Sequence, residues 1–387
     1  MEIKKGYKMT DVGVIPEDWE VKSIGEVLSI CNGMDYKHLN RGNYPVYGTG
    51  GLIARVDDFL FEGESVCIGR KGTIDTPIYL NEKFWTVDTL FYSINFVGVI
   101  PKFIYYIFNT IDWLSLNEAS GVPSLSKDNI KLQLIQIPNL SEQQAIADAL
   151  TKVDNLIMSL SKVIEKKKLI KKGTMQKLLS GEVRLDGYNN IIKSVNLSDI
   201  GEIKAGGTPS TNVPSYWGGT INWLQSGAVK NRVLDIRDVE KTITYDGLAS
   251  SSAYLIKENS VLIAITGATC GNIAYLPFKS AANQSVVAIQ VNVGFNSKYI
   301  FYMLIQNSDK IVNNRGGSAQ GGVAVNILKE IELCIHEDID EQTAIADILT
   351  TMDNEIEALE KERDKYKCIK QGMMQQLLTG KIRLTCQ

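Results

Sequence analysis

Two stretches of the chain carry apolar residues at alternating intervals of four and three, which places those residues along one side of a helix. In the first stretch they are Ile146, Leu150, Val153, Ile157 and Leu160. In the second they are Ile345, Leu349, Met352, Ile356 and Leu359. An average repeat of about 3.5 residues is typical of the narrow seam of a coiled coil, whereas a helix covering a globular core has a broader apolar stripe. The pattern predicts two long helices, and we call these ten positions the helix seam.

The two stretches are copies of one another. Residues 141–185 align with residues 340–384 without a gap, and 25 of the 45 aligned positions are identical. A repeat of this length is a property of the architecture, so it governs how the rest of the chain is interpreted. The expected helix ends are Ser141 and Asp340 at the N-terminal caps, and Gly181 and Gly380 as left-handed C-terminal residues.

A helix with such a seam needs a facing partner, because each buried seam side chain contributes about 1.5–3 kcal/mol. For each copy the nearest candidate partner is the other copy. The strict repeat favours this pairing over the alternative, in which each helix packs separately on its own domain. The seam leaves parallel and antiparallel pairing open. An antiparallel pair would give the chain a pseudo-twofold axis and hold the flanking segments at a fixed distance.

Short β-branched segments, separated by glycine, alternate with the helical stretches and predict two globular parts. The expected strands are residues 44–47, 65–68, 78–80, 90–94, 261–266 and 286–291, and the expected shorter helices are residues 101–116 and 297–314. Both parts are expected to be mixed sheets with few helices and of similar size. Their sequences otherwise differ, which suggests two binding sites for two different targets.

Composition narrows the class of protein. The net charge of −3 argues against a simple nucleic-acid binder, which is usually basic. The six cysteines show no CxxC spacing and are interpreted as reduced thiols of a cytosolic protein. No apolar run reaches the roughly 18 residues of a membrane span.

The motifs of the common catalytic sites are missing from the sequence. The two histidines, His38 and His336, lie one in each globular part, without HExxH or Cys/His spacing. No GxxxxGK[ST] phosphate loop is present, and the glycine clusters fit no dinucleotide fingerprint. The sequence therefore favours a non-catalytic protein, with a nuclease or methyltransferase of unrecognised site as the enzymatic alternative.

Taken together, the chain resembles the specificity subunit of a type I restriction–modification system, and the resemblance covers essentially its whole length. The motifs that carry it are Glu142-Gln143 with Glu341-Gln342, Ile15-Pro16-Glu17-Asp18-Trp19, Ile68-Gly69-Arg70-Lys71-Gly72 and Gly206-Gly207-Thr208-Pro209-Ser210. Each motif alone would be weak, but their combination is highly specific.

The resemblance implies an α+β fold with two similar mixed α/β target recognition domains. These domains would be joined by two long helices that pair as an antiparallel coiled coil with pseudo-twofold symmetry. The expected segments are residues 1–140 and 186–339 for the two recognition domains, and residues 141–185 and 340–387 for the two helices.

The resemblance also implies function and partners. Each domain would read one half of a bipartite double-stranded DNA target, and the helices would set the spacing and dock two methyltransferase subunits. Those subunits would bind S-adenosylmethionine, and restriction subunits would bind ATP and Mg²⁺, so this chain would hold no cofactor and no metal and have no catalytic residue. A cytoplasmic, prokaryotic protein without membrane contact is expected. The alternative is a coiled-coil scaffold that joins two interaction modules without binding DNA.

The resemblance does not say which side chains contact DNA. Arg, Asn and Gln can pair with base edges, whereas Lys and Ser suit phosphates. Loops rich in such residues occur in both globular parts. The candidate DNA contacts are Lys37, Arg41, Arg70, Lys71 and Trp85 in the first part, and Thr208, Ser210, Tyr216, Gln284, Arg315 and Gln320 in the second.

Overall fold

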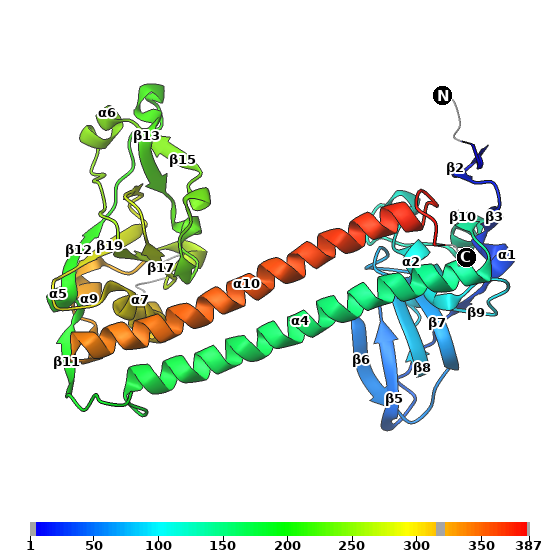
Figure 1. Ribbon diagram of the computed structural model, residues 1–387, viewed down its shortest axis with the longest axis horizontal. Helices are drawn as coiled ribbons and strands as arrows, with labels where there is room; N and C mark the ends of the chain where they lie inside the picture. Colours follow the sequence, from blue (N-terminus) through cyan, green and yellow to red (C-terminus); the bar gives the residue numbers. More distant parts are fainter. Residues whose placement is uncertain (1–4, 315–321, 385–387) are drawn as a thin grey trace. The chain divides into compact units, whose positions relative to one another are not determined.

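The structure is a computed structural model that describes residues 5–314 and 322–384, and it divides into two compact units. Unit 1 comprises residues 1–162 and 360–387, and unit 2 comprises residues 163–359. Each unit therefore contains one globular part, the first half of one long helix and the second half of the other (Figure 1). The sequence-based division treats each helix as a segment of its own, whereas the compact units share both helices.

The two long helices pair in each unit. The helices are α4 (Leu140–Ser180) and α10 (Ile339–Leu377). In unit 1, Lys370 Nζ of α10 lies 2.6 Å from the carboxylate of Asp154 in α4. In unit 2, Lys171 Nζ of α4 lies 2.5 Å from the carboxylate of Asp353 in α10. Because the first half of each helix meets the second half of the other, the pairing is antiparallel, as predicted.

The N-terminal caps lie two residues before the predicted ones. Asn139 Oδ1 accepts a hydrogen bond from the backbone N–H of Glu142 at 2.9 Å, and Asp338 Oδ1 accepts one from Asp340 at 2.8 Å. The predictions of Ser141 and Asp340 as caps were wrong, because an earlier side chain reaches the free N–H groups of the first turn.

The C-terminal ends of the long helices agree with the prediction. Gly181 has a φ of +73° and Gly380 a φ of +69°. This left-handed conformation strains residues with a Cβ, which explains a glycine at each of these ends.

The helix seam changes its surroundings along each helix. Ile146 and Leu150 are fully buried in the core of unit 1, and Ile345 and Leu349 in the core of unit 2. Ile356 is also buried. The remaining seam residues are half-buried, and they are Val153, Ile157, Leu160, Met352 and Leu359. The seam is therefore a domain core at the start of each helix and a thin helix–helix contact farther along.

Unit 1 is built around a six-stranded sheet in the order β4-β9-β7-β8-β5-β6. The strands are β1 (Tyr7–Thr10), β2 (Gly13–Pro16), β3 (Glu20–Ser23), β4 (Ser29–Asn32), β5 (Arg41–Gly48), β6 (Gly51–Val56), β7 (Phe61–Gly69), β8 (Ile78–Thr86), β9 (Leu90–Ile94) and β10 (Leu134–Ile137). The short helices are α1 (Ile24–Val27), α2 (Pro101–Phe108), η1 (Trp113–Leu116) and α3 (Lys127–Leu132).

Unit 2 has a five-stranded sheet in the order β12-β19-β16-β17-β14 and a three-stranded sheet β15-β13-β18. The strands are β11 (Ile192–Asn196), β12 (Gly201–Ala205), β13 (Trp217–Leu224), β14 (Arg232–Val233), β15 (Lys241–Ile243), β16 (Ser260–Ala264), β17 (Ile273–Leu276), β18 (Ala281–Ala282), β19 (Val286–Val291) and β20 (Glu332–His336). The helices are α5 (Leu197–Ile200), η2 (Pro214–Tyr216), η3 (Ser226–Ala228), η4 (Ile236–Asp238), α6 (Tyr245–Ala249), η5 (Gly267–Thr269), α7 (Ser297–Gln306), α8 (Ser308–Val312) and α9 (Val325–Lys329).

The two sheets share a frame of four antiparallel strands. The order β4-β9-β7-β8 in unit 1 has the same succession as β12-β19-β16-β17 in unit 2. Beyond β8 and β17 the units differ, because unit 1 adds the hairpin β5–β6 whereas unit 2 adds β14. The prediction of two similar mixed α/β parts is confirmed.

The predicted shorter helices are each interrupted. α2 and α7 end at C-terminal caps formed by Asn109 and Asn307, whose amide side chains turn back to carbonyls of the last turn. Asparagine competes in this way with helix continuation, so the predicted helices 101–116 and 297–314 each become two short ones.

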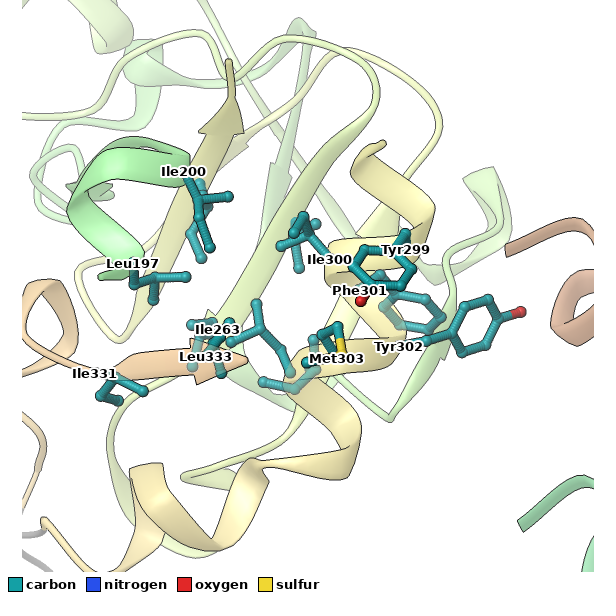
Figure 2. Packing of buried hydrophobic residues seen from close by; sticks show 14 of the residues in the cluster. Leu197, Ile200, Ile263, Tyr299, Ile300, Phe301, Tyr302, Met303, Ile331 and Leu333 are labelled. Atoms are coloured by element: carbon teal, nitrogen blue, oxygen red, sulfur yellow. The ribbon is translucent and has the colours of Figure 1, made fainter. Parts of the chain in front are cut away.

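The core of unit 2 shows how a globular part is attached to the long helices. Figure 2 shows Ile263 and Leu333 from strands packed with Ile300 and Met303 of α7. The same cluster takes in residues from both long helices, and these are Leu178, Leu179, Ile345, Ala346 and Leu349. The core of unit 1 is built in the same way from Ile146, Ala147, Leu150, Leu377 and Leu378.

Candidate nucleic-acid interface and helix junctions

A tight turn after β7 presents Arg70 and Lys71 in unit 1. A Cβ at Gly69 would overlap the carbonyl oxygen of Thr73, and Gly72 has a φ of +99°. The Arg70 backbone N–H donates to the Thr89 carbonyl at 2.8 Å, which fixes the turn against the β8–β9 connection. Glycine is therefore required on both sides of the two cations, and both side chains are exposed.

Arg70 and Lys71 lie in one recess with further polar groups. The recess has a volume of about 820 Å³, and its other polar lining residues are Asn32, Asp88, Thr89, Glu118, Ser124, Ser126 and Lys127. Glu118 accepts hydrogen bonds from Ser126 at 2.6 Å and from Asn129. Three cations against two carboxylates, with amide and hydroxyl groups between them, can contact both phosphates and base edges. Sequence inspection missed Asn32 and Lys127, which are distant from Arg70 along the chain.

The other candidates of unit 1 lie outside this recess. Lys37 is exposed on the loop before β5, and Arg41 begins β5 beside a second recess that it shares with Arg55. Trp85 is only 5% exposed, and its indole N–H donates to the Met34 carbonyl at 2.8 Å. The structure therefore does not offer Trp85 as a DNA contact, because its ring is part of a small apolar cluster with Val46 and Val56.

In unit 2 the structure brings Thr208 and Gln284 together. The Thr208 hydroxyl donates to the side-chain oxygen of Gln284, and the Gln284 side chain is exposed. This contact depends on a close approach of the backbone, because a Cβ at Gly207 would overlap the backbone nitrogen of Ala253. Both side chains lie at a surface where a partner could reach them.

Ser210 and Tyr216 lie in the segment that leads into β13. Ser210 is exposed, and its carbonyl accepts a hydrogen bond from the indole of Trp217 at 3.2 Å. Tyr216 ends the short helix η2 and is half-buried. Arg315 and Gln320 lie outside the described residues.

A polar recess of unit 2 was not anticipated from the sequence. It has a volume of about 320 Å³, and its charged and amide lining residues are Gln225, Lys230, Arg237, Asp238, Glu240 and Lys241. Arg237 is turned toward Asp235, with Nε 2.8 Å from a carboxylate oxygen. The density of cations between residues 230 and 241 is the sequence signal that could have identified this recess.

In unit 1, a buried ion pair joins Glu142, near the start of α4, to Arg383, which follows the end of α10. Arg383 donates through Nε and Nη2 to the two carboxylate oxygens of Glu142, each at 2.8 Å, and Glu142 is 1% exposed. The indole N–H of Trp19 donates to the same carboxylate at 3.1 Å. Arg383 also bonds Asp18, and this contact holds the pKa of the Asp18 carboxyl below its usual value. The pair ties the start of α4 to the segment after α10.

Unit 2 contains an equivalent buried ion pair, but a different side chain lies beside its glutamate. Arg184 donates to the fully buried Glu341 at 2.7 and 2.6 Å. The third neighbour is His336, whose Nε2 lies 3.9 Å from Glu341 and whose Nδ1 is 2.7 Å from the Tyr299 hydroxyl. Burial lowers the pKa of His336, with Glu341 opposing and Arg184 reinforcing the shift. Glu142 and Glu341 are equivalent positions of the repeat, as are Arg184 and Arg383. This equivalence is the sequence signal that could have identified the two ion pairs.

No helix in the described ranges 5–314 and 322–384 is both long and apolar enough to cross a membrane.

Comparisons with known proteins agree with this construction. Two specificity subunits of type I restriction enzymes from Methanocaldococcus jannaschii match nearly the whole chain. That of MjaVIII is 26% identical over 96% of this chain and 94% of its own, and that assigned to MjaX is 25% identical over 98% and 97%. The S subunit of a type I restriction–modification system from M. genitalium has the same fold, with a TM-score of 0.69 at 15% identity over 97% of this chain and 98% of its own.

The model of one protein family matches the chain twice. It is described as the type I restriction modification DNA specificity domain, and the matched segments are residues 16–171 and 191–365. Each match contains one globular part and most of the long helix that follows it. The chain therefore belongs to the family of type I restriction–modification DNA specificity proteins.

Proposed function

We propose that each globular part reads one half of a bipartite DNA target and that the paired helices set the spacing between the halves. The observation that carries this proposal is the repeated frame with unlike surfaces. Both units attach the same four-strand sheet to both helices, yet a recess with Arg70 and Lys71 marks unit 1, whereas Thr208 and Gln284 mark unit 2. Phosphate contacts position a protein on DNA, and different polar side chains at base edges select different sequences.

The proposed assembly supplies the chemistry from other chains. Two methyltransferase subunits that bind S-adenosylmethionine would dock on the helices, and restriction subunits that use ATP and Mg²⁺ would join them. In this proposal the chain itself has no catalytic residue and binds no cofactor. Its net charge of −3 supports the division of labour, because a chain without excess cations releases few counterions on binding DNA.

The test is to co-express the chain with its methyltransferase subunits and to map modified adenines across a genome. We expect an interrupted motif, in which two short specific blocks flank a fixed number of unspecified base pairs. A continuous motif would contradict the proposal. Modification without any sequence preference, or no modification with an active methyltransferase present, would instead support the scaffold that does not bind DNA.

A further inference from the structure

Three side chains meet at one junction in unit 1. The Tyr106 hydroxyl, from α2, donates to Asp154 Oδ2 in α4 at 2.8 Å, and Lys370 Nζ in α10 lies 2.6 Å from Asp154 Oδ1. The Tyr106 oxygen is also 3.1 Å from Thr151 Oγ1, one turn earlier in α4. A single carboxylate therefore joins the globular part to both long helices.

Unit 2 contains the same junction. The Tyr302 hydroxyl, from α7, donates to Asp353 Oδ2 in α10 at 2.8 Å, and Lys171 Nζ in α4 lies 2.5 Å from Asp353 Oδ1. Figure 2 shows the Tyr302 ring at the edge of the core cluster, with its hydroxyl pointing away from the apolar side chains. Thr350 again lies one turn earlier, 3.4 Å from this hydroxyl.

The repeat of the helices explains only part of this correspondence. Asp154 and Asp353 are equivalent in the repeat, as are Lys171 and Lys370. The tyrosines belong to the globular parts, whose sequences otherwise differ, yet each part directs a tyrosine hydroxyl to the same carboxylate. The junction therefore depends on all three elements of a unit, and the duplicated helix alone does not produce it.

The environment of the junctions makes them stronger than ordinary surface pairs. The lysines Lys370 and Lys171 are 21% and 19% exposed, and their aspartate partners Asp154 and Asp353 are 31% and 36% exposed. The pair Lys167–Glu355 links the same two helices at 2.7 Å, but its side chains are 41% and 52% exposed and no tyrosine hydroxyl bonds it in the described structure. Charge-assisted hydrogen bonds between partly buried groups are worth more than exposed ion pairs, which are screened.

The geometry also selects one register of the helices. Each aspartate must face a tyrosine of its own unit and a lysine of the opposite helix at once. A slip by one helical turn would move the aspartate by about 5.4 Å and break both contacts. Apolar seam residues discriminate registers less sharply, because one half-buried aliphatic side chain can replace another.

We infer that the two Tyr–Asp–Lys junctions are positioning sites that hold each globular part on both helices in one register and thereby restrict the DNA spacer to one length. This inference rests on the proposed function, because a spacer exists only if the target is bipartite. Within it, the six residues Tyr106, Asp154, Lys370, Tyr302, Asp353 and Lys171 determine spacer specificity without touching DNA.

The first experiment maps modified adenines for the full chain co-expressed with its methyltransferase subunits. One variant combines Tyr106→Phe with Tyr302→Phe, which removes only the two hydroxyls, and a second is Asp154→Asn. Glu355→Gln is the control, because it breaks the exposed pair between the same helices. We expect sites with a spacer one base pair longer or shorter to be modified about tenfold more often in both junction variants, as loss of a charge-assisted hydrogen bond implies. An unchanged single spacer in the tyrosine variant, or equal broadening in the control, would overturn the inference.

The second experiment needs no DNA. A double-mutant cycle in urea unfolding combines Asp154→Asn with Lys370→Met and compares the pair with Glu355→Gln and Lys167→Met. We expect a coupling of at least about threefold in the unfolding equilibrium constant at the junction and less at the exposed pair. Equal couplings would overturn the junction as a positioning site. A wild-type map without an interrupted motif would refute the proposed function instead, and the cycle would still decide whether the junction holds.

Discussion

Two glutamates, Glu142 in unit 1 and Glu341 in unit 2, carry carboxylates that are buried in the protein. Both glutamates are at most 1% exposed, and each lies near the start of one copy of the repeat and is bonded by the arginine near the end of the other copy. A buried carboxylate is tolerated only while it is paired, so each arginine is needed for the folded state even though the pair itself need not add stability over an apolar contact.

Removing the arginine of unit 1 tests this dependence. Among the described residues, Arg383→Ala leaves the Glu142 carboxylate with the N–H groups of Trp19 and Leu384 as its remaining donors, and we expect the free energy of unfolding to fall by about 3 kcal/mol. Urea denaturation followed by circular dichroism measures the loss. Arg237→Ala is the matched control, because it removes an exposed partner of Asp235 and should leave the unfolding midpoint unchanged. Equal effects of the two variants would show that the Glu142 site is more open to water than the structure indicates.

His336 lies beside the buried ion pair of unit 2, so we expect acid to affect the stability of the two ion-pair sites differently. Burial lowers its pKa from the usual value of 6.5, so the folded chain resists protonation while the unfolded chain takes up the proton at the usual pKa. The free energy of unfolding should therefore fall as pH drops below about 6.5. His336→Gln should reduce this slope between pH 7.5 and about 5.5. Urea unfolding at several pH values measures the slope, and the same slope in wild type and His336→Gln would contradict the assignment.

The long helices were the elements most visible in the sequence. The repeat and its seam predicted their number, length and pairing, because a strict apolar period over several turns is rarely produced by any other structure. Their caps were predicted two residues late, since Asn139 and Asp338 stand outside the repeat of apolar positions. The seam pattern did not predict which seam residues belong to a domain core and which lie between the two helices. A leucine occupies the same heptad position whether a sheet or another helix covers it.

That division predicts unequal losses along one helix. Leu150→Ala removes a fully buried side chain from the core of unit 1 and should lower the free energy of unfolding by about 2–5 kcal/mol. Leu160→Ala removes a half-buried side chain ten residues later and should cost clearly less. Urea denaturation of the two variants provides the comparison. Equal losses would indicate a uniform coiled coil along the whole of α4.

The candidate contact surfaces were less predictable than the helices. Arg70 and Lys71 were chosen from a polar loop of the first globular part, but Asn32, at the end of β4, and Lys127, at the start of α3, join their recess only through the fold. Trp85 was chosen for its aromatic ring, yet the fold uses that ring as core. The alternation of buried and exposed positions along a strand normally predicts whether a tryptophan is buried. Bulges interrupt this alternation, as they do in the neighbouring β5, so the sequence did not predict that Trp85 is buried.

In the proposed function of the whole molecule, the two units share a four-strand frame but carry different surfaces, and each surface reads its own part of the DNA target. The two family matches, residues 16–171 and 191–365, agree with two copies of one recognition module. Each module is completed by the helix half that belongs to the other copy, so neither globular part is expected to keep its geometry without both helices.

The most direct measurement compares the modified sites of two single variants, Arg70→Ala in unit 1 and Gln284→Ala in unit 2, each co-expressed with the methyltransferase subunits. Both side chains are exposed, so neither change should unfold its unit. We predict that each variant relaxes one specific block of the interrupted motif, that the two blocks differ, and that the spacer stays constant. Relaxation of the same block by both variants, or of both blocks by either one, would contradict the assignment of one half-site to each unit.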